Sequence, residues 1–179
     1  MLAFGTGTNV ANGNQSIAIG NNVSAMSGKS LAIGQSNEVN SPYSLAFGEN
    51  SYTSGNGKAF AIGNAAAATE AFSYAFGKNV EANGQYSRVI GLSSKANGNY
   101  SVAIGKSNII SSLENNSDGI FVGGINNIAN VKKNGPSFIY GRNNVLTDAG
   151  LNFIAGDRLS SSHNWSMMLG GYAKSTNDN

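Results

Sequence analysis

The sequence predicts an all-β protein in which a strand–turn–strand–turn unit repeats about twelve times and winds into a parallel β-roll. Three observations predict this fold: a recurring five-residue unit that ends in glycine, alternation of large and small side chains within that unit, and turn-forming residues between units. The chain has 179 residues, which suits one domain, and 24 of them are glycine. Such repeats are typical of solenoids, in which each coil packs only against its neighbours.

The repeated unit reads approximately Ser-apolar-Ala-apolar-Gly. Its spacing is nearly constant over most of the chain, as from Gly20 to Gly34, and it lengthens on both sides of Gly123. We therefore expect coils of roughly 14–18 residues each, a period in the range of repeat proteins. The glycines that close the units are placed at Gly5, Gly20, Gly34, Gly48, Gly63, Gly77, Gly91, Gly105, Gly123, Gly141, Gly156 and Gly170.

Each unit is predicted to be a short strand with two different faces. The residues three and one before the glycine are large and apolar, as in Ile17 and Ile19, whereas those four and two before it are small, as in Ser16 and Ala18. Because side chains alternate between the two faces of a strand, the large residues share one face and the small residues the other. This period of two, with β-branched and aromatic residues, favours a strand over a helix. We expect the large apolar faces to meet inside the roll.

A second, weaker apolar stretch follows each glycine and leads into a turn. Val80 and Ala82 form one such stretch, and Asn83-Gly84 is the turn that follows it. Asn and Gly adopt positive φ at low cost, which suits tight turns. A unit of this length has no room for the helical crossover that usually joins parallel strands. Each strand is therefore expected to pair with the same strand of the next coil, about 4.8 Å away.

The small face of the first strand needs an explanation of its own, because exposed strands usually carry larger polar residues. Small side chains let another backbone approach closely, so we expect three copies of the chain to form a cyclic homotrimer through this face. The alternative is that the alanines fit a tight bend inside the roll. The predicted interface residues are Ala18, Ala32, Ala46, Ala61, Ala75 and Ala103.

The regular repeats are predicted to cover residues 1–110, and residues 111–179 to continue the roll with longer coils and inserted loops. Loops on a rigid scaffold are where binding residues concentrate, although a solvated loop tip is the alternative. The candidate ligand-contact residues in these loops are Glu114, Asn115, Asn116, Lys132, Lys133 and Asn134.

Aromatic residues recur five positions before the closing glycine, where the chain enters the first strand. They form either an exposed ladder for glycan or protein contact or a staple that joins successive coils. These residues are Tyr43, Phe72, Tyr86, Tyr100 and Trp165.

The composition excludes several classes of function. The chain has no cysteine, which excludes disulfides, thiolate metal sites and cysteine nucleophiles, and its only histidine is His163. A net charge of +2 without a basic run gives no sign of a nucleic-acid partner, and the nine acidic residues form no pair spaced for acid–base catalysis. We therefore expect no enzymatic activity, no catalytic residue, no metal, no cofactor and no direct contact of this segment with a membrane.

Three segments resemble a known family of surface proteins. Asn14-Gln15-Ser16-Ile17-Ala18-Ile19-Gly20, Ala82-Asn83-Gly84-Gln85-Tyr86-Ser87 and Gly98-Asn99-Tyr100-Ser101-Val102-Ala103-Ile104-Gly105 are similar to the head repeats of trimeric autotransporter adhesins, the YadA-like family of Gram-negative bacteria. The likeness is close over residues 1–110 and weaker beyond. It implies a left-handed parallel β-roll, three chains around a threefold axis, and display on a stalk anchored at the outer membrane.

The resemblance also implies what the protein does. Heads of this family attach the bacterium to extracellular-matrix proteins, host cells, other bacteria or abiotic surfaces, and trimeric display multiplies weak contacts. On this interpretation the chain is a head-domain fragment of a longer exported protein at the cell surface. A phage or tailocin tail-fibre segment, or a structural spacer in a surface fibre, is the alternative.

Overall fold

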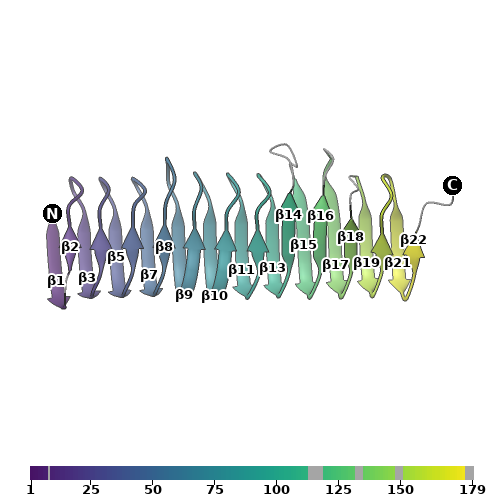
Figure 1. Cartoon of the computed structure of the whole chain (residues 1–179), viewed down its shortest axis with the longest axis horizontal. Coiled ribbons are helices and arrows are strands. Elements are labelled where there is room, and N and C mark those ends of the chain that lie inside the picture. Colours follow the sequence, from purple (N-terminus) through teal and green to yellow (C-terminus); the bar gives the residue numbers. More distant parts are fainter. Residues whose placement is uncertain (8, 113–118, 132–134, 148–150, 176–179) are drawn as a thin grey trace.

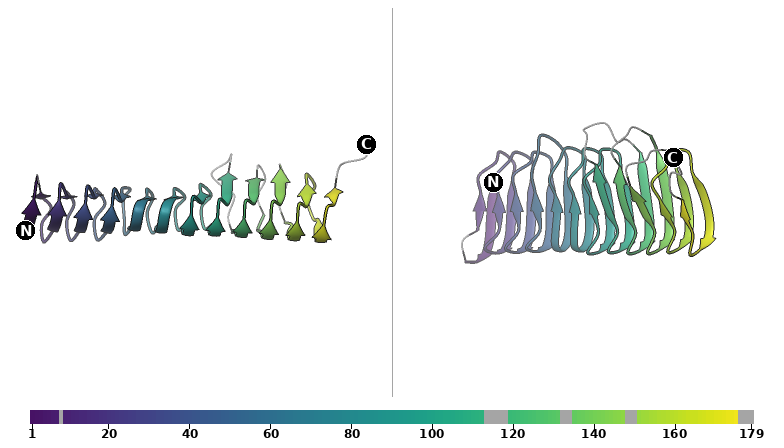
Figure 2. Two further views of the ribbon diagram at one scale, coloured as in Figure 1. Left: turned by 90° about the horizontal axis from the view of Figure 1, so that it is seen from below. Right: turned by 45° about the vertical axis from the view of Figure 1, so that its right-hand side comes forward.

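The computed structural model in Figure 1 is a straight rod of short strands joined by turns, with the two termini at opposite ends. It describes residues 1–7, 9–112, 119–131, 135–147 and 151–175. Most coils contribute two strands, which pair in parallel with the equivalent strands of the adjacent coils (Figure 2). The prediction of an all-β parallel solenoid is confirmed, while the hand of the coil stays an expectation from the resemblance.

The strands form two ladders that run the length of the rod. The first ladder contains β1 (Leu2–Thr6), β3 (Ile17–Asn21), β5 (Leu31–Gln35), β7 (Leu45–Glu49), β11 (Arg88–Leu92), β13 (Val102–Lys106), β15 (Ile120–Ile125), β17 (Ser137–Arg142), β19 (Phe153–Asp157) and β21 (Met167–Gly171). The second ladder contains β2 (Val10–Ala11), β4 (Ser24–Ala25), β6 (Glu38–Val39), β8 (Tyr52–Thr53), β12 (Lys95–Ala96), β14 (Ile109–Ser112), β16 (Ile128–Val131), β18 (Val145–Thr147), β20 (Ser160–Ser161) and β22 (Lys174–Ser175). The longer strands β9 (Phe60–Ala68) and β10 (Tyr74–Ala82) run through both ladders.

The first ladder faces the opposite way from the expectation. Its large apolar residues point outward, and Phe47, for example, is 49 % exposed. Its small residues point into the roll, so the predicted homotrimer interface at the alanines is wrong, and their place inside the roll is the alternative that holds. Ala18, Ala32, Ala46, Ala61, Ala75 and Ala103 are each 0 % exposed within the single chain.

The narrow interior explains this orientation. The first strand ends at its glycine, and the second strand of the coil begins only a few residues later, as β3 and β4 do. The two strands therefore lie close together, and Ala18 shares its buried cluster with Ala25 of the facing strand. Larger inward residues occur further along, where Ile139 and Leu146 are buried in the same coil. Interiors tolerate neither voids nor overlap, so the space between the ladders sets the size of the inward side chains.

A stack of closing glycines lets the coils approach closely at one corner. Gly77 has φ 139°, a region that L-residues with a side chain rarely adopt. A Cβ atom added to Gly77 would lie 1.9 Å from the carbonyl oxygen of Gly91 in the next coil. The same contact recurs along the rod, because each closing glycine pairs with the next in register. Glycine is therefore required here by both backbone conformation and space.

The glycine stack corrects one position of the predicted repeat. Gly105 pairs with Gly124, and Gly124 pairs with Gly141, so Gly124 rather than Gly123 closes that coil. Gly123 instead occupies an outward position, where an added Cβ would contact the rings of Phe121 and Tyr140. Two adjacent glycines leave the sequence ambiguous at this point, and only the strand pairing resolves it.

Buried asparagines join successive coils at the corner that follows the glycine. Asn127 is 0 % exposed, and its Oδ1 accepts a hydrogen bond from the backbone N–H of Asn144 at 2.9 Å. Its Nδ2 donates to the carbonyl oxygens of Gly123 and Gly141, each at 2.9 Å. Asn144 repeats the arrangement with the N–H of Leu159 at 2.9 Å. One side chain thus satisfies backbone groups of its own coil and of the next.

Replacing Gly77 by alanine should destabilise the roll strongly. The new Cβ overlaps the Gly91 carbonyl group, and the backbone is held in an unfavourable region. We expect the free energy of unfolding to fall by at least about 3 kcal/mol, measured by chemical denaturation followed by circular dichroism. Gly28→Ala is the matched control, because its Cβ would meet only the Asn14 carbonyl oxygen at 3.6 Å. Equal stability of the two variants would contradict the requirement for glycine.

Asn127→Ala tests the contribution of the buried asparagines that join successive coils. The substitution leaves backbone donors and acceptors without their buried partner, so we expect a loss of about 3 kcal/mol in the free energy of unfolding. Asn130→Ala is the control, since Asn130 lies half-buried on the outward face of β16 in the same coil. Its expected cost is less than about 1 kcal/mol. If the free energy of unfolding falls no more in Asn127→Ala than in Asn130→Ala, the buried asparagines add nothing to stability.

Candidate functional site

The outward face of the first ladder forms a largely apolar surface along the rod, interrupted by Arg88 in β11, and we call this surface the apolar stripe. Its exposed side chains include Phe47 at 49 %, Ile90 at 46 % and Tyr140 at 57 %. Large apolar surfaces of this kind mark sites of interaction. The stripe consists of Ile17, Ile19, Leu31, Ile33, Leu45, Phe47, Phe60, Ile62, Tyr74, Phe76, Ile90, Val102, Ile104, Phe121, Phe138, Tyr140, Phe153, Met167 and Leu169.

Aromatic rings within the stripe are stacked from coil to coil. The ring of Phe138 lies between those of Phe121 and Phe153, with centroid distances of 5.0 and 5.1 Å. Phe60 and Tyr74 stack in the same manner at 5.2 Å. Ring stacking adds to the stability of each pair and fixes the rings before any partner arrives. The stripe is therefore a pre-organised surface.

The outward face of the second ladder has a different character over coils that carry the regular repeat. Ser24, Glu38, Glu81 and Lys95 occupy outward positions there. Lys95 Nζ lies 2.5 Å from Glu81 Oε2, and this hydrogen bond is the main cause of the lowered pKa of the Glu81 carboxyl group. Water solvates this face well, so the two faces of the rod are chemically unequal.

Removing the ammonium group should raise the pKa of Glu81. Lys95→Gln takes away the hydrogen bond and the positive charge that favour the carboxylate, and the carboxyl pKa should rise toward its ordinary value. Because the pKa of Glu81 is lowered in the fold, its stabilising contribution is present above the ordinary pKa and is lost as pH falls through the lowered value. A carbon-detected NMR titration measures the shift, with Asp157 beside Arg142 as the internal control. An unchanged Glu81 titration would contradict this cause.

The corner that leads into the first ladder carries the predicted row of aromatic residues. Phe72, Tyr86 and Tyr100 stack ring on ring with centroid distances of 4.9 and 4.8 Å. Each of them has a positive φ, between 52° and 59°. Because their faces are occupied by one another, these three rings act as the predicted staple between coils.

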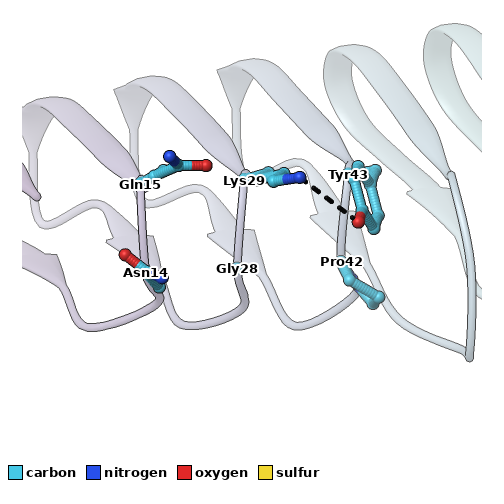
Figure 3. Close-up of a pocket in the computed structure, with 6 residues that line it drawn as sticks. All are labelled: Asn14, Gln15, Gly28, Lys29, Pro42 and Tyr43. Carbon is cyan, nitrogen blue, oxygen red and sulfur yellow. Dashed lines mark hydrogen bonds between the residues drawn. The ribbon is translucent and has the colours of Figure 1, made fainter.

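Tyr43 occupies the same corner position but has a different neighbour. Its ring is 51 % exposed, and the Lys29 Nζ atom lies 4.8 Å from the ring centroid. Lys29 also donates a hydrogen bond to the Tyr43 hydroxyl group at 3.4 Å. A shallow pocket of about 170 Å³ opens beside this pair (Figure 3). Its lining comes from equivalent positions of three successive coils: Asn14, Gln15, Gly28, Lys29, Pro42 and Tyr43.

The loop candidates Glu114, Asn115, Asn116, Lys132, Lys133 and Asn134 lie outside the described residues and stay predictions. The His163 Nδ1 atom is 3.1 Å from the Ser175 hydroxyl oxygen. Within the described ranges, no group of three or more His, Asp or Glu residues could hold a metal ion. The same part of the chain has no helix long and apolar enough to span a membrane.

The large apolar residues of the stripe are evident in the sequence, but the prediction that they lie inside the roll is wrong. Repeat length alone does not decide this orientation, because Ile139 and Ile154 are buried in coils about as short as the step from Gly20 to Gly34. In the regular repeats the Ser and Ala rows fill the space between the two ladders instead. The smaller Ser and Ala rows fit that space, as Ser101 and Ala103 show by being fully buried.

These features together define a repetitive β-solenoid whose surface, rather than an enclosed cavity, is available for assembly and binding. Residues 2–22, 29–51 and 82–108 match the family described as YadA head domain repeat (2 copies). These three segments are therefore similar to the repeats of YadA-like heads, which form an adhesive and structural module. No curated protein gives a significant match to the chain.

Proposed function

We propose that this β-roll is the head of a homotrimeric adhesin on the surface of a Gram-negative bacterium, where it attaches the cell to extracellular-matrix proteins, host cells or other surfaces. The observation that carries the proposal is the apolar stripe, which runs along the rod on one face only. The YadA-like head repeats support the adhesive role. The proposal places the trimer contact on the stripe, in place of the alanine row.

A second copy of the same rod is the partner that fits the stripe best. The stripe repeats once per coil, with a spacing of about 4.8 Å set by parallel strand pairing. A partner that buries the stripe over its whole length must have the same spacing and a similar length, and another copy of this chain has both. Three copies around one axis bury all three stripes at once in a closed assembly.

Trimeric display explains how weak contacts could suffice for attachment. The stripe faces inward in the proposed trimer, so the turn corners and the polar outward face of the second ladder remain accessible. Each ligand site then occurs three times per trimer and many times per cell, which raises the overall affinity without any new contact. The matrix or cell-surface ligand would bind at these accessible positions. Glu114 and Lys132, which lie outside the described residues, remain candidates from the sequence alone.

Ile104→Lys tests the assembly. Ile104 is 38 % exposed on the stripe, and Ile109 is 38 % exposed on the second ladder of the same coil. A lysine at residue 104 would be buried in the trimer without a partner, so we expect sedimentation to show dissociation to monomers. Ile109→Lys is the matched control and should stay trimeric. A monomeric wild-type chain, or equal effects of both substitutions, would contradict the proposed interface.

The same variants test the adhesive role. Wild-type protein and the Ile109→Lys variant should bind a surface coated with matrix proteins or intact host cells. The monomeric Ile104→Lys variant should bind at least about tenfold less, because it lacks avidity. A trimeric wild-type protein that binds none of these surfaces would contradict the adhesive role while leaving the assembly intact.

A further inference from the structure

The pocket beside Tyr43 has the chemistry of a small binding site. Figure 3 shows Gln15, Lys29 and Tyr43 aligned along one row of the corner, with Asn14, Gly28 and Pro42 in a second row. Gly28 carries no side chain, and an added Cβ would meet only the Asn14 carbonyl oxygen at 3.6 Å. The floor of the pocket is therefore open between two coils.

The pocket combines an aromatic surface, amide groups and one cation. Tyr43 offers a half-exposed ring, Asn14 and Gln15 can both donate and accept hydrogen bonds, and Lys29 supplies a positive charge. None of the six lining residues is acidic. An apolar ring with a few convergent polar groups is the usual composition of a site for a small ligand.

The charge along this corner is positive beyond the pocket itself. Tyr43 lies between Lys29 of the preceding coil and Lys58 of the following coil, because Leu31 pairs with Leu45 and Leu45 with Phe60. Lys58 is exposed. An anionic ligand seated on Tyr43 therefore meets a positive charge on either side along the rod.

The ring of Tyr43 is more exposed than its backbone conformation and its place in the repeat require. Tyr43 has φ 57°, which is unfavourable for a bulky residue, whereas Asn or Gly would adopt it readily. Tyr86 in the equivalent position is stacked between two other rings, which offsets the strain. Tyr43 instead contacts the Lys29 ammonium group and keeps much of its ring exposed. Because Gln15 and Lys29 share this positive φ, with 59° and 55°, the feature that distinguishes Tyr43 is its exposed, unstacked ring.

From these observations we propose that the pocket binds one acidic sugar residue of a glycan, with its apolar ring face on Tyr43 and its carboxylate or sulfate on Lys29. The amide groups of Asn14 and Gln15 bind its hydroxyl groups. The volume is below the range of about 300–1,000 Å³ typical of drug-sized ligands, which suits a single sugar ring. This inference supplies a ligand class for the proposed adhesive function, and it rests on that function for its biological role.

A saccharide fits this corner better than a peptide. Peptides bound in extended form usually add a strand to a free sheet edge. At these coils the first-ladder strands β3, β5 and β7 are each paired with the neighbouring coils, so they offer no free edge. An acidic peptide therefore serves as an alternative ligand in the test.

Binding of four probes to the whole 179-residue chain tests the inference, measured by NMR shift changes and calorimetry. The probes are a sulfated heparin-type tetrasaccharide, sialyllactose, neutral lactose and a short oligoglutamate peptide. We expect at least one of the acidic saccharides to bind about tenfold more tightly than lactose and the peptide, and binding to weaken as salt is added. Comparison of the two acidic saccharides distinguishes a sulfated matrix glycan from a sialylated cell-surface glycan.

Two substitutions connect the binding to the pocket. Lys29→Gln should weaken acidic saccharide binding about fivefold, and Tyr43→Asn about tenfold. Both should keep the wild-type thermal midpoint, because Gln15 already occupies this corner position and Asn tolerates positive φ. Lys78→Gln is the matched control, since Lys78 is exposed at the opposite corner of its coil. It should leave the affinity within about twofold.

The inference is overturned if neither acidic saccharide binds, if lactose or the peptide binds equally well, or if both pocket variants bind like the wild type. These outcomes would leave the proposed adhesin function standing as long as the chain is trimeric and attaches to surfaces. If instead the adhesive role is wrong, the trimer fails to attach to surfaces although its pocket still binds the saccharide.

Discussion

The contact between closing glycines of successive coils is the constraint on which the rod depends. At this corner the carbonyl oxygen of one glycine lies where the preceding coil would carry a Cβ atom, as at Gly77 and Gly91. The close approach keeps the coils in register and allows asparagines such as Asn127 to bridge neighbouring carbonyl and N–H groups. Coil stacking and buried hydrogen bonding are therefore two results of one backbone arrangement.

The tight coil also decides what the surface looks like. Over the regular repeats the inward positions of the first ladder are filled by small residues such as Ala18, so its large apolar residues point outward and form the apolar stripe. Extended exposed apolar surfaces of this kind mark sites of interaction with a partner. The same constraint that builds the rod thus creates the surface through which copies can associate.

Function in this architecture is distributed along the rod. The described residues provide rows of equivalent positions, and local replacements in a row create different chemistry. At the corner row, stacked rings at Phe72, Tyr86 and Tyr100 join coils, whereas Lys29 and Tyr43 border an open pocket. A solenoid can therefore change its binding properties at one coil without altering its framework, since each coil contacts only its neighbours.

The amino-acid sequence was enough to predict the solenoid, its period and the first strand of each coil, because glycine spacing and alternation are local features that repeat along the chain. It also separated the large row, with Ile17 and Ile19, from the small row, with Ser16 and Ala18. Which row faces inward is decided only in the folded chain. The alternation of side chains is the same for either orientation of a strand, and the space between the two ladders selects one of them. The pairing of Gly124 with Gly105 and the pocket at Tyr43 likewise depend on which residues of different coils lie side by side.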